Sequence, residues 1–291
     1  MNGIINVIKP PSMSSNGVTV YLRKILNEKK VGHAGTLDPG AAGVLVIMLG
    51  KSTRLSDILM GHKKTYVARV RFGRGTDTLD SYGKATETGH AHITEEEMRR
   101  TAEGFLGEIE QTPPGYSAIK INGEKAYELA RKGKEFEIPR RKISIDSIDI
   151  LEKTREDEYL LRIVCSKGTY IRTLLHDMGQ ALGTTAYTSL LIRESSGSFH
   201  IKDAWTLDEI EEMVKKGDDS FIIRNEECLE EFDVLKLPSG MKDDIDNGRT
   251  LNYMDCRPET ELFKVYVEEE FYGLGTDDNG HPKLKIYLKE N

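Results

Sequence analysis

The chain has few of the residues and segments that mark several common protein classes. Only three cysteines occur in 291 residues, and their spacing fits neither a disulfide framework nor a zinc site. The seven histidines are scattered, without the spacing of a histidine metal motif. No apolar run approaches the roughly 20 residues of a membrane-spanning helix, and no signal peptide is visible. We therefore expect a cytoplasmic protein without a metal site.

The two common patterns of nucleotide-binding loops are missing as well. The glycine-rich segment at residues 32–43 is not closed by Gly-Lys-Ser/Thr, as the P-loop pattern requires. The dinucleotide pattern G-x-G-x-x-G does not occur. A loop that holds the phosphates of a nucleotide cofactor is therefore not expected in this segment.

That segment, GHAGTLDPGAAG, is the most distinctive part of the chain. It holds four glycines, one proline and a single carboxylate, Asp38, and the next residues are typical of a buried strand. Glycines allow positive φ and close approach by a ligand, and Pro39 biases Asp38 away from the helical region. Such a loop can present a catalytic carboxylate to a bulky substrate. An ordinary turn that begins at Asp-Pro is the alternative interpretation.

The net charge of −7 conceals an uneven distribution. Residues 1–75 carry twelve Lys and Arg against three Asp and Glu, whereas residues 203–291 carry eleven against twenty-four. Basic residues flank the glycine loop on both sides: Arg23, Lys24, Lys29, Lys30, Lys51, Arg54, Lys63 and Lys64. Because the local field decides whether phosphates approach, the pattern favours a polyanion partner for the N-terminal region. The acidic C-terminal third is interpreted as a solvated surface.

Hydrophobic periodicity predicts an α+β fold with a mixed, mainly antiparallel sheet. The expected strands are 3–8, 44–49, 65–72, 143–151 and 158–166, and the expected helices are 17–27, 53–59, 95–105, 124–132, 171–182 and 207–216. Thr94 and Thr206 each open a helix with a capping box. After residue 230, short strands at 263–267, 271–275 and 284–288 alternate with acidic turns, and Asn279-Gly280 predicts a hairpin.

Five motifs occur in one order along the chain. The glycine loop is followed by Lys64-Thr65-Tyr66-Val67-Ala68, by a segment at 73–83 that contains Thr-Asp-Thr, by Pro-Pro-Gly-Tyr-Ser-Ala-Ile-Lys from residue 113, and by Lys-Gly-Thr-Tyr-Ile-Arg at 167–172 with Leu191-x-Arg193. Over about residues 3–200 this set resembles the TruB family, the bacterial tRNA pseudouridine synthases that act on uridine 55 of the T-loop. The resemblance implies a catalytic domain of the pseudouridine synthase type at 1–230, with an RNA-clamping insertion at 117–142. A small, β-barrel-like PUA-type module is implied at 231–291.

The resemblance also implies roles for particular residues. Asp38 matches the catalytic aspartate, and Arg172 matches the arginine that pairs with it. Tyr66 matches the tyrosine that stacks on the target uracil. The other expected substrate-binding residues are His33 near the flipped-out base, Tyr170 and Leu191 in the uridine pocket, Asp80 in either a pocket or a turn, and Lys9 with Pro10 near the active-site loop.

The basic residues of the insertion are expected to meet phosphates and to make affinity sensitive to salt. They are Lys120, Lys125, Arg131, Lys132, Arg140, Arg141 and Lys142. The chain departs from the family pattern at Ser12, at Asn16 and at Ile192, where an arginine is usual, and in its acidic C-terminal module. These departures touch neither Asp38 nor Tyr66 nor Arg172.

The implied reaction breaks the C1′–N1 bond, turns the uracil over and joins C5 to C1′. No electron or phosphoryl group moves, so no cofactor is expected. Because a nearby guanidinium lowers a carboxyl pKa, we expect Arg172 to keep Asp38 ionised. Asp38 has three possible roles: it attacks C1′, attacks C6 or removes a sugar proton.

Two alternative functions remain at this point. One is a non-catalytic tRNA-binding or folding module on the same scaffold, and the other is an enzyme of nucleotide phosphates. Some relatives work with a guide RNA and protein partners, but the lack of basic tails favours a stand-alone enzyme, expected to be a monomer. The expected partner is the T-arm of tRNA, with no membrane association.

Overall fold

The computed structural model describes residues 1–291 except 118, 122, 134–135, 250–257, 279–280 and 290–291. The side chains of Lys120, Lys125, Arg131 and Asp278 also lie outside the description. The expected hairpin turn at Asn279-Gly280 falls on residues that are not described.

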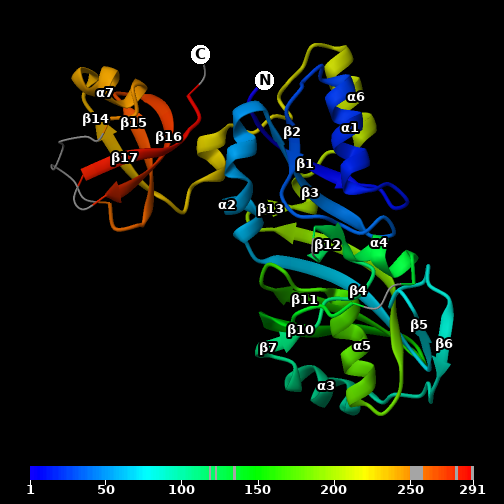
Figure 1. The fold of residues 1–291 in the computed structure, drawn as a ribbon. Coiled ribbons are helices and arrows are strands. Elements are labelled where there is room, and N and C mark those ends of the chain that lie inside the picture. The colour runs from blue at the N-terminus through cyan, green and yellow to red at the C-terminus, as the bar shows by residue number, and fades with distance from the viewer. Residues whose placement is uncertain (118, 122, 134–135, 250–257, 279–280, 290–291) are drawn as a thin grey trace.

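A nine-stranded sheet forms the centre of the molecule (Figure 1). Its main path runs β1-β3-β12-β4-β11-β10-β7, with β2 paired to β3 and β13 paired to β12. Within this sheet only the β12–β3 pair is parallel among the pairs described, so the predicted α+β, mainly antiparallel fold is confirmed. The strands are β1 (Gly3–Lys9), β2 (Val31–His33), β3 (Ala42–Leu49), β4 (Lys64–Phe72), β7 (Gly107–Gln111), β10 (Arg141–Arg155), β11 (Glu158–Cys165), β12 (Ala186–Ser196) and β13 (Phe199–His200).

Two short hairpins and a set of helices surround this sheet. The hairpins are β5 (Arg74–Thr76) with β6 (Ala85–Thr88), and β8 (Lys120–Ile121) with β9 (Glu124–Lys125). The helices are α1 (Ser15–Ile25), α2 (Ser56–Gly61), α3 (Glu95–Gly104), α4 (Ala126–Arg131), α5 (Ile171–Ala181), α6 (Leu207–Lys215) and α7 (Lys242–Asp246), with 3₁₀ turns at Gly50–Leu55, Ile201–Asp203, Asn225–Cys228 and Ser239–Met241. Side chains cap α1, α3 and α6, with Ser14 capping α1 and the two predicted capping boxes at Thr94 and Thr206 both formed.

The helices cover different parts of the sheet (Figure 1). On one face of the β4–β10 half, α3 and α5 contribute Met98 and Leu174 to a core that also contains Val70 and Phe72 of β4. A second core joins α1 and α6 to β1. Burial on β4 alternates from Lys64 to Phe72, which places Tyr66 on the face that turns toward α5.

Strand β12 was not among the expected elements, although it lies between β3 and β4 in the middle of the sheet. Its sequence, AYTSLLIRESS, mixes small, polar and charged residues and lacks the clean alternation that indicates a strand. Polar residues are tolerated inside the sheet here because their groups are bonded: Arg193 is 1% exposed and donates to main-chain carbonyls. The site described below depends on this strand.

The C-terminal strands form a separate four-stranded sheet in the order β14-β15-β16-β17. They are β14 (Asp233–Leu237), β15 (Leu262–Val267), β16 (Glu270–Asp278) and β17 (His281–Tyr287). The described strands follow an open path, so this part is a sheet and not a closed barrel. It has its own core around Phe263 and Tyr272, while Leu274 and Leu288 pack in a cluster with residues of β3 and α2.

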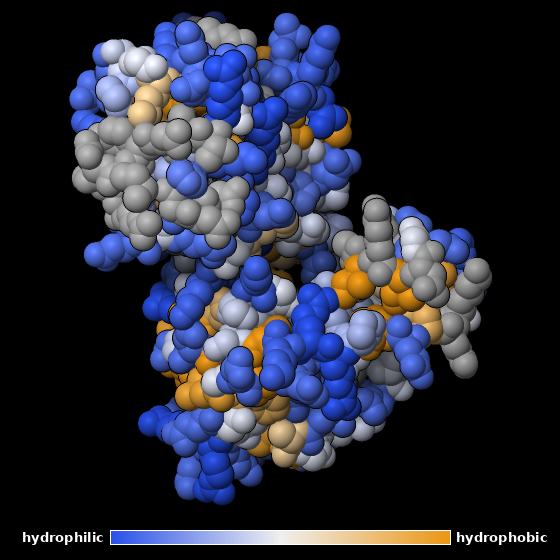
Figure 2. Space-filling view, turned by 60° about the vertical axis from the view of Figure 1, so that its left-hand side comes forward, coloured by the Kyte–Doolittle hydropathy of each residue, from blue (hydrophilic) through white to orange (hydrophobic). Residues whose placement is uncertain are grey.

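The face shown in Figure 2 is mainly hydrophilic, with hydrophobic residues gathered in separate patches. None of the described helices is long and apolar enough to cross a membrane. Within the described ranges no three His, Cys, Asp or Glu side chains cluster as a metal site would require. Cys165 and Cys228 are buried free thiols, and Cys256 lies outside the description.

Candidate active site

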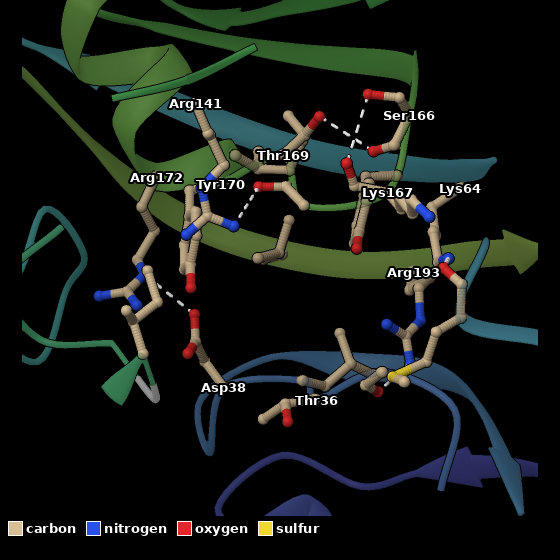
Figure 3. Close-up of a pocket in the computed structure, with 18 of the residues that line it drawn as sticks. Thr36, Asp38, Lys64, Arg141, Ser166, Lys167, Thr169, Tyr170, Arg172 and Arg193 are labelled. Carbon is tan, nitrogen blue, oxygen red and sulfur yellow. Dashed lines mark hydrogen bonds and ion pairs between the residues drawn. The ribbon is translucent and has the colours of Figure 1, made fainter. Parts of the chain in front are cut away.

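A cavity of about 690 Å³ opens where the glycine loop, the start of α5 and the middle of β12 meet (Figure 3). Asp38, Tyr66, Tyr170, Arg172 and Leu191 all line it, so residues from distant motifs share one site. In Figure 3, Asp38 and Arg172 stand on one side of the cavity, and Lys64 and Arg193 stand on the other.

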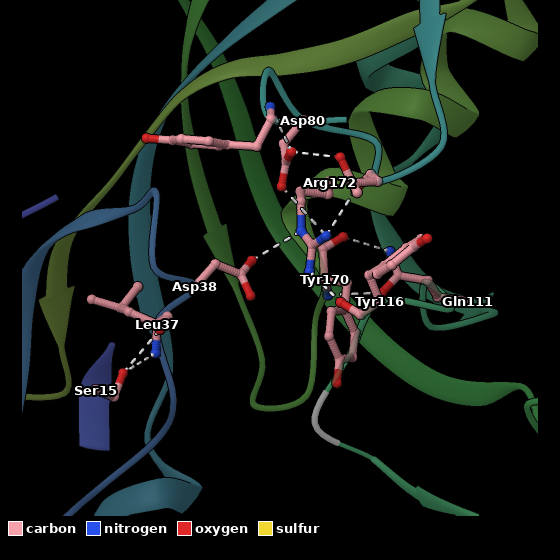
Figure 4. A network of polar contacts seen from close by, with 10 residues as sticks. Ser15, Leu37, Asp38, Asp80, Gln111, Tyr116, Tyr170 and Arg172 are labelled. Carbon is pink, nitrogen blue, oxygen red and sulfur yellow. Dashed lines mark hydrogen bonds and ion pairs between the residues drawn. The ribbon is translucent and has the colours of Figure 1, made fainter. Parts of the chain in front are cut away.

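The loop that carries Asp38 is held by contacts at both ends. Ser15 Oγ accepts a hydrogen bond from the main-chain N–H of Leu37 at 2.8 Å and donates to its carbonyl at 2.9 Å (Figure 4). The buried Lys9 ammonium donates to the carbonyls of Pro10, Met13 and Pro39 at 2.8, 2.7 and 3.3 Å. Burial lowers the pKa of Lys9 to about 8, and Asp38 opposes that shift. Lys9 therefore stabilises the backbone of this loop and of the segment after β1 through its hydrogen bonds. It is not among the residues that line the cavity.

Gly43 closes the loop in a conformation that other residues rarely adopt. Its φ is +104°, and a Cβ at this position would lie 2.3 Å from the carbonyl oxygen of Arg193. We expect Gly43→Ala to lower the free energy of unfolding by at least about 2 kcal/mol, because backbone strain and overpacking add. Thermal or urea unfolding measures the loss.

The control for that substitution is Gly104→Ala at the end of α3. A Cβ at Gly104 would meet no heavy atom of the described residues within 4 Å, and the φ of Gly104 is not positive. Alanine there is expected to leave stability unchanged or to raise it by up to about 1 kcal/mol. Equal stability changes for the two substitutions would show that the Gly43 conformation is not required.

Arg172 holds Asp38 and Asp80 together (Figure 4). Its Nε lies 2.9 Å from Asp38 Oδ2, and its Nη1 lies 3.5 Å from Asp80 Oδ2. It also donates to the carbonyls of Thr78 and Tyr116 at 2.8 and 3.0 Å. The side chain is only 5% exposed, although a cation in the first turn of a helix opposes the helix dipole. The two carboxylates offset that cost.

The pKa of Asp38 departs from what the sequence led us to expect. Burial raises the pKa of this carboxyl above its ordinary value, and the charge of Arg172 only opposes the shift. The charge of Asp80 adds to the rise. Arg172 lies within ion-pair distance of Asp38, as the sequence led us to expect, but desolvation outweighs the ion pair in the direction of the pKa shift. The side chain remains 37% exposed, so it can still meet a ligand.

Asp80 caps a turn and also lines a small cavity, the two positions that the sequence left open. Its Oδ1 accepts hydrogen bonds from Thr78 Oγ1 at 2.6 Å and from the main-chain N–H of Tyr82 at 3.0 Å, as a turn cap does. Its Oδ2 faces Arg172. Asp80 lines a small second cavity beside the main one, and that cavity also contains Asp38 and Arg172.

Arg193 is the main residue to which the sequence reasoning gave no role. Its Nε donates to the carbonyl of Val44 at 2.7 Å, and its Nη2 donates to that of Gly35 at 3.1 Å. It thus ties β12 to both ends of the glycine loop. Burial raises the pKa of the Tyr66 hydroxyl, whereas the charge of Arg193 and a hydrogen bond with it oppose the rise. The Leu191-x-Arg193 spacing was noted as a motif, but its burial is visible only in the structure.

Lys64 is a second buried cation at the cavity. Its ammonium donates to the carbonyls of Met60 and His62 at 2.7 and 2.5 Å. Burial, followed by the charge of Arg193, lowers its pKa to about 8. The side of the cavity that faces away from Asp38 is therefore electropositive.

The remaining expected residues lie at or near this site. Gln111 holds the main chain of Tyr170 through bonds of 2.8 and 3.1 Å, and Arg141 lies 4.9 Å from the ring centre of Tyr170. Leu191 packs partly buried against the main core. His33 lies on β2 and does not line the cavity; burial, followed by the charge of Arg193, lowers its pKa.

The basic residues of the insertion divide into three groups. Arg141 lines the cavity at the start of β10. Its chain neighbours Arg140 and Lys142 are exposed, and Arg140 lies 3.8 Å from Glu110. Lys132 pairs with Glu124 at 2.8 Å. The side chains of Lys120, Lys125 and Arg131 lie outside the described residues, so their predicted contact with RNA stays a prediction.

Comparison with protein families finds two adjoining matches. A model of the TruB family pseudouridylate synthase (N terminal domain) matches residues 23–171, and one of the tRNA pseudouridylate synthase B C-terminal domain matches residues 172–232. The tRNA pseudouridine synthase B of Caldanaerobacter subterraneus is 40% identical over 281 residues, 94% of this chain and 95% of the relative. That of Staphylococcus aureus is 42% identical over 295 residues, 99% of this chain and 94% of the relative.

Solved structures show the same fold. A chain in an H/ACA RNP bound to a substrate RNA containing 2′-deoxyuridine matches with a TM-score of 0.73 at 24% identity, covering 98% of this chain and 85% of that one. A chain in a Cbf5-Nop10-Gar1 complex matches with a TM-score of 0.71 at 26% identity, covering 99% of this chain and 84% of that one. These likenesses extend over both sheets of the molecule.

Proposed function

The chain belongs to the TruB family of pseudouridylate synthases, and from this premise we propose that it isomerises a tRNA uridine to pseudouridine, at position 55 of the T-loop. The observation that carries the proposal is the position of Asp38. Its carboxylate is partly exposed on the wall of a cavity of about 690 Å³ and is held 2.9 Å from a buried guanidinium. A nucleoside can enter such a cavity only after its base has left the stack of the RNA.

The cavity offers what an extruded uridine needs. Turning a base out of the stack costs a few kcal/mol, and stacking on an aromatic face returns about 1–3 kcal/mol. Tyr66 supplies that face, and Tyr170 and Leu191 close the sides of the pocket. His33, which lies outside the cavity lining, is assigned to the RNA around the vacated base position.

Asp38 acts on the sugar or base of the bound nucleotide. The C1′–N1 bond breaks with its electron pair moving into the uracil, C5 then bonds to C1′, and the C5 proton leaves. An ionised carboxylate can attack C1′, attack C6 or remove a sugar proton, and each route uses the same residue. Because burial raises the pKa of Asp38, the activity should decline on the acid side of its pH profile. No step requires an electron carrier or a phosphoryl group, so we propose a cofactor-independent reaction.

The proposal extends to the organisation of the chain. Residues 1–230 form the catalytic domain, residues 117–142 clamp the T-loop, and residues 231–291 are an accessory module. The enzyme acts as a monomer in the cytoplasm, without a guide RNA. The cavity supports the bounds of the catalytic domain, because all of its lining residues come from positions 35–193.

Exposed cations beside the cavity should set the salt dependence of tRNA binding. Arg140, just before β10, and Lys142, on β10, are both exposed and flank Arg141 of the cavity in the chain. We expect the double substitution Arg140→Gln with Lys142→Gln to weaken tRNA binding. It should also reduce the slope of log K against log salt by about 0.7–0.9 for each phosphate contact that is lost. Binding titrations at several salt concentrations measure this slope.

The matched control is Lys215→Gln with Lys216→Gln at the C-terminal end of α6, where two exposed lysines lie outside the cavity lining. That pair should leave the slope unchanged. An unchanged slope in the β10 variant as well would remove these residues from the RNA-binding surface.

The proposed function itself is tested with purified protein and an unmodified tRNA transcript. We expect pseudouridine at position 55, formed without added nucleotide, and none in a transcript that carries cytidine there. Strict dependence on ATP or GTP with Mg²⁺ would instead support an enzyme of nucleotide phosphates. Modification at another position would keep the activity but correct the substrate site.

A further inference from the structure

Tyr82 is an exposed aromatic residue at the edge of the active site. It lies between β5 and β6 and is 69% exposed, the largest fraction among the exposed large hydrophobic residues of the described chain. It lines the small second cavity, which shares Asp38, Arg172 and Leu191 with the main cavity. The ring therefore stands beside the carboxylate to which the reaction is assigned.

The main chain of Tyr82 is tied to the catalytic network. Its N–H donates to Asp80 Oδ1 at 3.0 Å, and the other oxygen of Asp80 lies 3.5 Å from Arg172 Nη1. The same turn is joined to β12 by a hydrogen bond of 3.0 Å from the N–H of Thr188 to the carbonyl of Leu79. An aromatic side chain on a fixed turn loses little conformational entropy when a ligand binds to it.

The ring also lies directly on the backbone of the Asp38 loop. A Cβ on Gly40 would lie 2.2 Å from Cε2 of the Tyr82 ring, closer than any real contact. Only glycine at position 40 allows this approach. Gly40 follows Asp38 by two residues, so the ring and the carboxylate are held by one short segment of backbone.

The charges around Tyr82 select the kind of group that it can bind. The charged side chains of the second cavity are the carboxylates of Asp38 and Asp80, which are 37% and 22% exposed, and the guanidinium of Arg172, which pairs with both and is only 5% exposed. The charge presented to a ligand is therefore mainly that of the carboxylates. These carboxylates repel phosphates, whereas the face of an aromatic ring attracts a flat, uncharged group. When a uridine has turned into the main cavity, the flat, uncharged groups nearest to it are the bases of the adjoining nucleotides.

We propose that Tyr82 stacks on the base of a nucleotide adjoining the target uridine, and so holds the RNA open while the uridine occupies the cavity. This inference rests on the proposed function. It adds a substrate-binding residue in the turn between β5 and β6, which lines the second cavity, whereas Tyr66 lines the main one.

The test uses the full chain and a T-arm RNA that carries 2-aminopurine on either side of the target uridine. We expect Tyr82→Ala to raise Kd and KM about tenfold, within the range of one lost base–aromatic stack, with kcat and Tm little changed. At one of the two positions the bound probe should be brighter in the alanine variant than in wild type. Tyr82→Phe and Tyr82→Trp should restore both the affinity and the quenching.

The matched control is Leu151→Ala, which shortens an exposed apolar residue of β10 outside both cavities. It should change neither affinity nor fluorescence. If Tyr82→Ala bound the RNA and quenched the probe as wild type does, the inference would be overturned. Pseudouridine formation by wild type would still support the proposed function in that case. If wild type formed no pseudouridine, the proposed function and this inference would both fail.

Discussion

Replacing Asp38 by asparagine should abolish pseudouridine formation while tRNA binding is kept. The substitution preserves the shape of the side chain and leaves Arg172 its contacts with Asp80 and the carbonyls of Thr78 and Tyr116. It removes the only group at this position able to act as nucleophile or base. We expect the single-turnover rate to fall by at least about 10⁴-fold and the Kd for tRNA to change by less than about threefold.

The fold of this variant is expected to remain intact. Burial raises the folded-state pKa of Asp38, so the ionised carboxylate destabilises the fold fully at pH values above that raised pKa. The destabilisation shrinks as pH falls below the raised pKa and is absent below the unfolded-state pKa. At neutral pH the Tm of Asp38→Asn should therefore equal or exceed that of wild type.

Asp149→Asn provides the matched control, because Asp149 is a carboxylate on β10 outside the main cavity. It should retain full activity. In a protein that only binds RNA, Asp38→Asn and Asp149→Asn would not differ in the amount of pseudouridine formed. Wild-type product formation by Asp38→Asn would remove the carboxylate from the chemistry.

Replacing Arg172 by methionine should give the second largest loss. Arg172 is the only cation within ion-pair distance of Asp38 among the described residues. It also pairs with Asp80 and donates hydrogen bonds to two main-chain carbonyls. We expect the single-turnover rate at neutral pH to fall about 10²- to 10³-fold.

The pH profile separates the electrostatic role of Arg172 from a structural one. The guanidinium opposes the raised pKa of Asp38, so its removal raises that pKa further, and the acid limb of the profile moves to higher pH. Arg172→Lys keeps the charge and should move the limb less, although it cannot reproduce all the contacts of the guanidinium. If the rate of Arg172→Met were lower than that of wild type by the same factor at every pH, Arg172 would act through packing alone.

Local sequence signals predicted much of the fold. The capping boxes at Thr94 and Thr206 fix two helix starts through bonds made within four residues, so they are visible without tertiary information. The strand at 65–72 was predicted from alternation, because one face of β4 is buried and the other is half-exposed. Strand β12 lacked this signal, since its polar residues are bonded inside the sheet.

The parts of the site that could not be predicted depend on burial. The resemblance to the TruB family implied that Asp38, Tyr66, Tyr170 and Arg172 share one site, and the structure places these four side chains on one cavity. The direction of the Asp38 pKa shift follows from desolvation, which a sequence does not display. The burial of Arg193 and the contact between Tyr82 and Gly40 likewise arise from segments far apart along the chain or from the path of a loop.

The most direct test of the account is the release of tritium from tRNA labelled at C5 of uridine. Joining C5 to C1′ must expel the C5 hydrogen, so the assay reports the new bond and not RNA binding. We predict that wild type releases one tritium per tRNA from position 55 and that Asp38→Asn releases none. Release of tritium by Asp38→Asn at the wild-type rate, or no release by correctly folded wild type, would contradict the central claim that the Asp38 cavity isomerises a tRNA uridine.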